Sequence, residues 1–180
     1  KSVQDQDAAI LSTQKSIDSV HRTLCLMTGW SADAQPEIRA VPEPDLGRID
    51  SINLEADQET ALKNNYTIRY NEKKLGNLSA STQIEATKAT IEDARNNVIN
   101  GLKTQYNTIL TTAQLQLQLA QVDLEKAAAS LAVGSSTQLQ YQSAENAFIT
   151  AKNTVETTKL QLLLAMENYD WIVKGLVASK

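Results

Sequence analysis

The spacing of small and apolar residues in the last quarter of the chain is the strongest constraint on its fold. From residue 137 onward, steps of four and three alternate without interruption, through Thr137, Tyr141, Ala144, Phe148, Ala151, Val155, Thr158, Leu162, Ala165, Tyr169, Ile172 and Leu176. Such spacing places a narrow apolar seam along one side of a long helix and is typical of a coiled coil. The sequence therefore predicts a long helix over residues 135–178 that packs against another helix.

The segment before it carries a similar seam. Its positions are Ile99, Leu102, Tyr106, Ile109, Ala113, Leu117, Ala120, Leu124, Ala127 and Leu131. Two successive steps of four around Ala113 interrupt the alternation, and we expect the left-handed supercoil to relax there. The seam predicts a second long helix, over residues 80–133.

A turn is expected between these two helices. Gly134 can adopt the left-handed conformation that ends a helix, and Ser135 with Gln138 matches a capping box. With about 44 residues on each side at 1.5 Å per residue, the predicted antiparallel hairpin is on the order of 65 Å long. No charged residue occurs from 127 to 144. Either this tip is built to be covered by a partner, because uncharged groups lose water at little cost, or it is only a capped turn.

An opposite turn is expected further upstream. A helix over residues 57–76 is predicted, with Asp57 as its N-cap, from the spacing of Ala61, Asn65, Ile68, Glu72 and Leu75. Gly76 then favours a stop, and Thr82 with Glu85 forms a candidate capping box for the next helix. The alternative is one unbroken helix from residue 57 to residue 131.

The first 56 residues indicate an internal repeat. Residues 1–28 hold apolar residues seven apart and predict a helix. Shifting this segment by 138 positions superposes Ala9 on Ala147, Ile10 on Phe148, Ile17 on Val155, Asp18 on Glu156, Leu24 on Leu162 and Leu26 on Leu164. We interpret residues 1–28 as the last helix of a first repeat, whose remainder we expect to precede this chain, and residues 29–56 as a linker. The linker holds all three prolines and predicts one short strand at about 49–54.

Composition supports an all-α fold in a single elongated domain over residues 1–180. Only 4% of residues are aromatic, and 6 Gly and 3 Pro leave few turns, so the elements should be few and long. The net charge of −4 and the lack of a Lys/Arg run argue against nucleic acid as a partner. No apolar stretch approaches the ~20 residues of a membrane-spanning helix.

Residues that could support catalysis are sparse. His21 is the only histidine, and no Ser, Cys or acidic pair accompanies it at a recognisable spacing. Cys25 cannot form an internal disulfide, and its apolar neighbours predict a buried thiol. Phosphate-binding glycine loops and clustered metal ligands are not found. We therefore predict no enzymatic activity, no cofactor and no metal.

A second apolar stripe accompanies the main seam in residues 104–122, a stretch without charge. It consists of Leu115, Leu119 and Val122. Two stripes on one helix indicate neighbours on both sides, as in the wall of a barrel, or a central helix in a simple bundle. The Gln and Thr residues of this stretch suit a polar lumen and suit plain solvent equally well.

The order of these features resembles the outer membrane efflux protein family, the TolC-like channel-tunnels. The matching pieces are "ALKNNYTIRYNEKKL", the pattern of Tyr106, Ile109, Leu110, Ala113 and Leu117, "LCLMTGW" before the proline linker, and "VGSSTQL" with the apolar residues that follow it. The resemblance implies a homotrimer whose helices form a periplasmic tunnel below a β-barrel in the outer membrane. It also implies that Val133, Gly134, Ser135 and Ser136 lie where family members meet the adaptor or pump subunit.

One departure from the family pattern concerns its barrel strands. Only about six residues separate the segments around Leu75 and Thr82, too few for membrane strands of ~9–11 residues each. Either the strands were removed by design, or this relative never had them. The resemblance predicts a structural conduit or pump-docking component for efflux across the cell envelope, located in the periplasm or at the outer membrane. The alternative is a coiled-coil scaffold or spacer of the envelope that forms no channel.

Overall fold

The computed structural model describes residues 2–31, 33–34, 40–133 and 138–176 and divides the chain into two compact units, Lys1–Ala40 and Val41–Lys180. The sequence predicted a single domain. Because the chain divides into two units, each unit is described by itself. The described residues form helices and connecting segments without a β-strand, which confirms the all-α prediction. The short strand expected at 49–54 is wrong.

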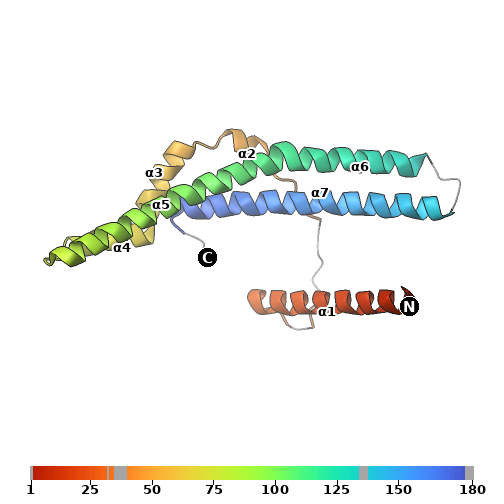
Figure 1. Ribbon diagram of the computed structural model, residues 1–180, viewed down its shortest axis with the longest axis horizontal. Coiled ribbons are helices and arrows are strands. Elements are labelled where there is room, and N and C mark those ends of the chain that lie inside the picture. The colour runs from red at the N-terminus through yellow and green to blue at the C-terminus, as the bar shows by residue number, and fades with distance from the viewer. Residues whose placement is uncertain (1, 32, 35–39, 134–137, 177–180) are drawn as a thin grey trace. The chain divides into compact units, whose positions relative to one another are not determined.

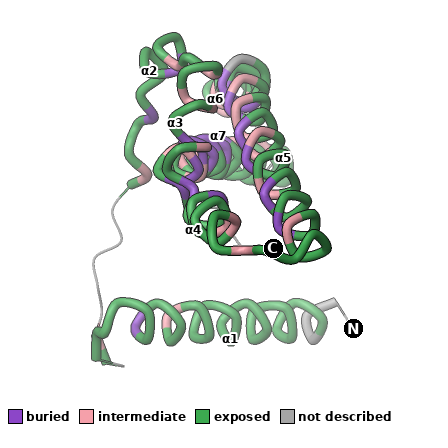
Figure 2. The backbone as a smooth tube through the Cα atoms, turned by 90° about the vertical axis from the view of Figure 1, so that its left-hand side faces the viewer, coloured by how far each residue is buried: buried purple, intermediate pink, exposed green. Residues whose placement is uncertain are grey.

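The first unit consists of helix α1 (Ser2–Thr28) and the segment that follows it. Gly29 ends the helix with φ +72°, and the Trp30 N–H donates to the Cys25 carbonyl at 3.0 Å, as in a Schellman cap. His21 Nε2 donates to the Ala34 carbonyl at 2.7 Å. Cys25 is buried, as predicted, with its sulfur 3.7 Å from His21 Nε2. Most of α1 is exposed (Figure 2).

The second unit is built around a long rod. This rod consists of helix α5 (Ser81–Thr111), the π-helix η1 (Thr112–Gln116) and helix α6 (Leu117–Ala132), which follow one another without a break. Helix α7 (Gln138–Val173) lies alongside the rod and runs in the opposite direction (Figure 1). Buried residues lie on the side of α5 that is turned inward (Figure 2). The largest side chains that are almost fully buried in the core are those of Ile68, Val98, Leu102, Ile109 and Leu162.

The seam positions predicted from the sequence lie at this helix contact. Ala113, Leu117, Val155 and Leu162 are buried. Half-buried seam residues include Tyr106, Leu124, Leu131, Ala144, Phe148 and Ala151, whereas Tyr141 and Leu176, towards the two ends of the seam, are exposed. The spacing of three and four thus marks the contacting sides of both helices.

Upstream, the chain turns back between α4 (Tyr66–Leu75) and α5, so the alternative of one unbroken helix is wrong. Gly76 ends α4 as predicted, but with an ordinary right-handed φ of −65°. The expected capping box of Thr82 and Glu85 is wrong. The N-cap of helix α5 is Ala80, two residues before Thr82, and its methyl side chain makes no capping hydrogen bond.

The helix expected over 57–76 is two helices, α3 (Leu54–Asn64) and α4. Asn65 separates them with an extended backbone, and its Oδ1 accepts from the Ile68 N–H at 3.1 Å. A capping amide of this kind competes with the helical hydrogen bonds and starts a new helix. Asn53 similarly caps α3 through the Ala56 N–H at 3.2 Å, so the N-cap expected at Asp57 is wrong.

Residues 47–50 form one short helix, α2 (Gly47–Asp50), in place of the expected strand. Asp45 Oδ1 accepts from the Arg48 N–H at 3.3 Å, and Ser51 Oγ donates to the Arg48 carbonyl at 2.7 Å. A single strand without a partner leaves its backbone groups unpaired, whereas this turn pairs them locally.

Four polar contacts connect residues 43–64 with α7. These are Glu43 with Lys159, Arg48 with Asp170, Asp57 with Tyr169, and Asn64 Nδ2 with the Val173 carbonyl at 3.0 Å. The hydrogen bond that Lys159 donates to the Glu43 carboxylate raises the pKa of Lys159. The buried Tyr169 hydroxyl donates to Asp57 Oδ2 at 2.7 Å.

None of the described helices has the length and apolar character needed to cross a membrane.

Tyr169 gives this contact a pH dependence. Burial, followed by the bond to Asp57, raises the pKa of the Tyr169 hydroxyl above its usual 10.0. A raised pKa means that the folded state holds the proton more tightly than the unfolded state, so the stabilisation is complete below pH 10 and is lost as the pH rises through the folded-state value. We expect the free energy of unfolding to fall above pH 10 by up to about 1.4 kcal/mol per pH unit. Urea unfolding at a series of pH values measures this fall, and Tyr169→Phe should reduce it. An identical fall in that variant would assign it to other groups.

Candidate functional site

The π-helix η1 lies where the sequence seam slips. The seam residues Ile109, Ala113 and Leu117 are four apart in both steps, one residue more than the regular alternation allows, and all three are buried. A π-helical turn closes its hydrogen bonds over one residue more than an α-helical turn. The π-helix thus absorbs the extra residue and keeps the seam facing α7. Single π-helical turns of this kind occur frequently at functional sites.

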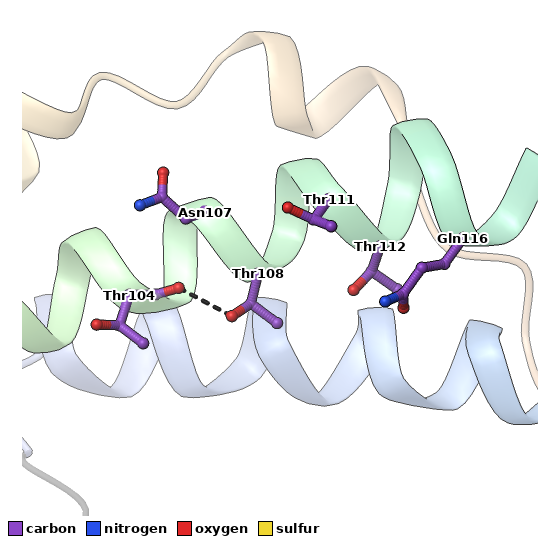
Figure 3. Close-up of a pocket in the computed structure, with 6 residues that line it drawn as sticks. All are labelled: Thr104, Asn107, Thr108, Thr111, Thr112 and Gln116. Atoms are coloured by element: carbon purple, nitrogen blue, oxygen red, sulfur yellow. Dashed lines mark hydrogen bonds between the residues drawn. The ribbon is translucent and has the colours of Figure 1, made fainter.

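A polar groove runs along the rod at the π-helix (Figure 3). It has a volume of about 370 Å³ and is lined by Thr104, Asn107, Thr108, Thr111, Thr112 and Gln116. In Figure 3 the side chains of Thr104, Thr108, Thr112 and Gln116 lie along the edge of the rod nearer to α7, at intervals of four residues, whereas Asn107 and Thr111 lie farther from α7. The groove is thus a row of hydroxyl and amide groups.

Its chemistry is that of neutral hydrogen-bonding groups. Thr108 Oγ1 donates to the Thr104 carbonyl at 2.9 Å, and the six lining side chains carry no charge at neutral pH. Hydroxyls and amides both donate and accept hydrogen bonds, so they can exchange partners with water and with polar solutes of either charge. These six side chains therefore offer no charge for the tight binding of an ion.

An uncovered apolar stripe continues from the groove onto α6. Leu115, Leu119 and Val122 are 57%, 56% and 44% exposed. Other elements of the second unit do not bury this stripe, so the rod is not the central helix of a bundle within that unit. Exposed apolar residues aligned in a stripe, as opposed to scattered singly, indicate an interaction surface.

The predicted hairpin tip is described only at its margins. Val133 is exposed at the end of α6, and Leu139 and Tyr141 are exposed near the start of α7. Gly134, Ser135 and Ser136 lie outside the described residues, as do the predicted left-handed cap and capping box. The adaptor-docking interpretation of the tip therefore stays a prediction.

The groove was not predicted as a site. The sequence showed a stretch without charge, and the recurrence of Thr104, Thr108, Thr112 and Gln116 at intervals of four was the signal that could have found it.

Among the described residues, no three His, Cys, Asp or Glu side chains are grouped so that they could hold a metal ion. Comparison with models of protein families, with characterised protein sequences and with solved structures finds no match to this chain.

Proposed function

We propose that the second unit is a wall element of a helical conduit in the cell envelope, in which several copies of the chain surround a polar lumen. By the resemblance to TolC-like proteins the number of copies is three, and the place is the periplasm or the outer membrane. The chain carries out no chemistry of its own in this proposal. It serves as a structural conduit or a docking component for the adaptor or pump subunit of an efflux system.

The uncovered stripe of Leu115, Leu119 and Val122 is the observation that supports this proposal best. The rod already fills one seam with α7, so a second stripe on the same rod calls for a second neighbour. The neutral groove of Thr104, Thr108 and their neighbours is compatible with a wetted inner wall along which solutes pass. The scaffold alternative would require neither a closed ring nor a lumen.

Sedimentation equilibrium at micromolar concentrations tests the proposal. We expect a closed oligomer, three copies by the resemblance, and we expect Leu119→Gln to weaken it. Burial of one leucine contributes about 1.5–3 kcal/mol, so the dissociation constant should rise at least about tenfold. Leu46→Gln is the matched control, because Leu46 is also exposed but lies in the linker before α2.

Two outcomes would contradict the conduit. One is a monomer at every concentration, and the other is an equal weakening by Leu119→Gln and Leu46→Gln. If a closed oligomer forms, end-on electron micrographs should show a central opening. A solid assembly would favour the scaffold.

A further inference from the structure

The outer face of α4 carries an unusual set of side chains. Five residues share this face of the helix by their spacing, and all five are exposed, namely Tyr66, Arg69, Tyr70, Lys73 and Lys74. The opposite face contains buried Ile68 and half-buried Leu75, which pack toward the core. The outer face therefore contains only aromatic and cationic side chains, and we call it the Tyr-Lys face.

The two tyrosines of this face are paired with each other. The rings of Tyr66 and Tyr70 stack with centroids 5.9 Å apart and an interplanar angle of 19°, while the residues stay 73% and 55% exposed. Such large exposed aromatic residues are not required by the packing of α4, which Ile68 and Leu75 provide. Tyrosine rings of this kind, apolar with a polar tip, are enriched where a protein meets the headgroup region of a bilayer.

The charge of this face is uncompensated. The only carboxylate of α4 is Glu72, which lies beside the inner face and pairs with Arg95 on α5 at 2.8 Å. Among the described residues, no ion pair involves Arg69, Lys73 or Lys74. A chain with a net charge of −4 thus presents three free cations together on one short helix.

We propose that the Tyr-Lys face binds the surface of an anionic phospholipid bilayer. The three cations complement lipid phosphates, and the tyrosine pair enters the headgroup layer beside them. A sugar platform is less well matched, because a glycan stacks on open ring faces and each of these rings already has one face on the other. This surface is independent of the groove and stripe of the proposed conduit.

Co-sedimentation of the full chain with vesicles tests this proposal. The vesicles are phosphatidylcholine alone, or phosphatidylcholine with phosphatidylglycerol as the anionic lipid. We expect binding to the anionic vesicles only, with an affinity that falls as salt is added. The triple variant R69Q/K73Q/K74Q should bind these vesicles about a hundredfold more weakly, because each cation near an anionic surface contributes about a factor of five.

The matched control is K103Q/K126Q/K152Q, which removes the same charge from exposed positions on α5, α6 and α7. It should retain most of the vesicle binding, and both variants should keep the helical signal and melting temperature of the parent. A second variant, Y66S/Y70S, should weaken binding while leaving the charge intact. Equal loss in the two charge variants, equal binding to neutral vesicles, or binding to an insoluble neutral glycan without vesicle binding would each overturn the proposal.

Discussion

Replacing Leu162 by aspartate is expected to unfold the second unit or to lower its free energy of unfolding by about 4 kcal/mol or more. Leu162 has no exposed surface and lies in the core between α7 and the rod. The substitution removes the buried side chain and places a carboxylate among apolar neighbours. Urea unfolding followed by circular dichroism measures the loss.

The same helix offers a close control. Leu164 is two residues away and exposed, so Leu164→Asp should change the free energy of unfolding by no more than about 0.5 kcal/mol. Where Leu162→Asp does not fold, Leu162→Ala should cost about 2–5 kcal/mol and keeps the comparison measurable. Similar effects at positions 162 and 164 would mean that α7 presents a different side to the rod.

Gly175→Ala is expected to destabilise the second unit by about 2–4 kcal/mol. Gly175 ends α7 with φ +90°, and a Cβ atom there would lie 2.4 Å from the Asn64 carbonyl oxygen. Alanine in the left-handed conformation costs about 1 kcal/mol, and displacement of the Asn64 backbone adds about 1–3 kcal/mol. The displacement would also disturb the hydrogen bond from Asn64 Nδ2 to the Val173 carbonyl. Thermal unfolding of the variant and the parent measures the sum.

Gly29→Ala separates the two causes. Gly29 has a similar φ of +72°, but nothing lies within 4 Å of the position of its added Cβ atom. Gly29→Ala should therefore cost only the roughly 1 kcal/mol of placing alanine in the left-handed conformation. It should leave the melting temperature of the second unit unchanged. If Gly175→Ala were as mild as Gly29→Ala, the close approach of Asn64 to the end of α7 would be wrong.

The parts of the fold that the sequence predicted are those set by repetition. The seams rest on many residues that agree, so one atypical residue does not obscure them. The turn after Leu75 was predicted from Gly76, which ends α4. The failures arose from single local hydrogen bonds. Asn65 divides one expected helix into two by capping Ile68, and Asp45 and Ser51 turn an expected strand into helix α2. Such bonds depend on side-chain geometry that a pattern of apolar residues does not contain.

The candidate site was predictable only in part. The second stripe of Leu115, Leu119 and Val122 follows from spacing, but its exposure depends on which neighbours pack against the rod. The groove is lined by residues of α5 and η1 and depends on the local course of the rod at the π-helix, and Gly134, Ser135 and Ser136 of the tip lie outside the described residues. The Tyr-Lys face could have been found from the intervals between Tyr66, Tyr70 and Lys73, had the exposed side of α4 been considered as well as its buried side.

The π-helix has a consequence for how this rod tolerates change in length. Because η1 takes up one surplus residue within a single turn, Leu102 and Ile109 before it and Leu117 and Ala120 after it all remain buried. An insertion in a uniform α-helix would instead rotate everything downstream by about 100° and turn the seam away from its partner. The defect confines the change in phase to five residues, so the one surplus residue leaves both halves of the rod aligned with α7.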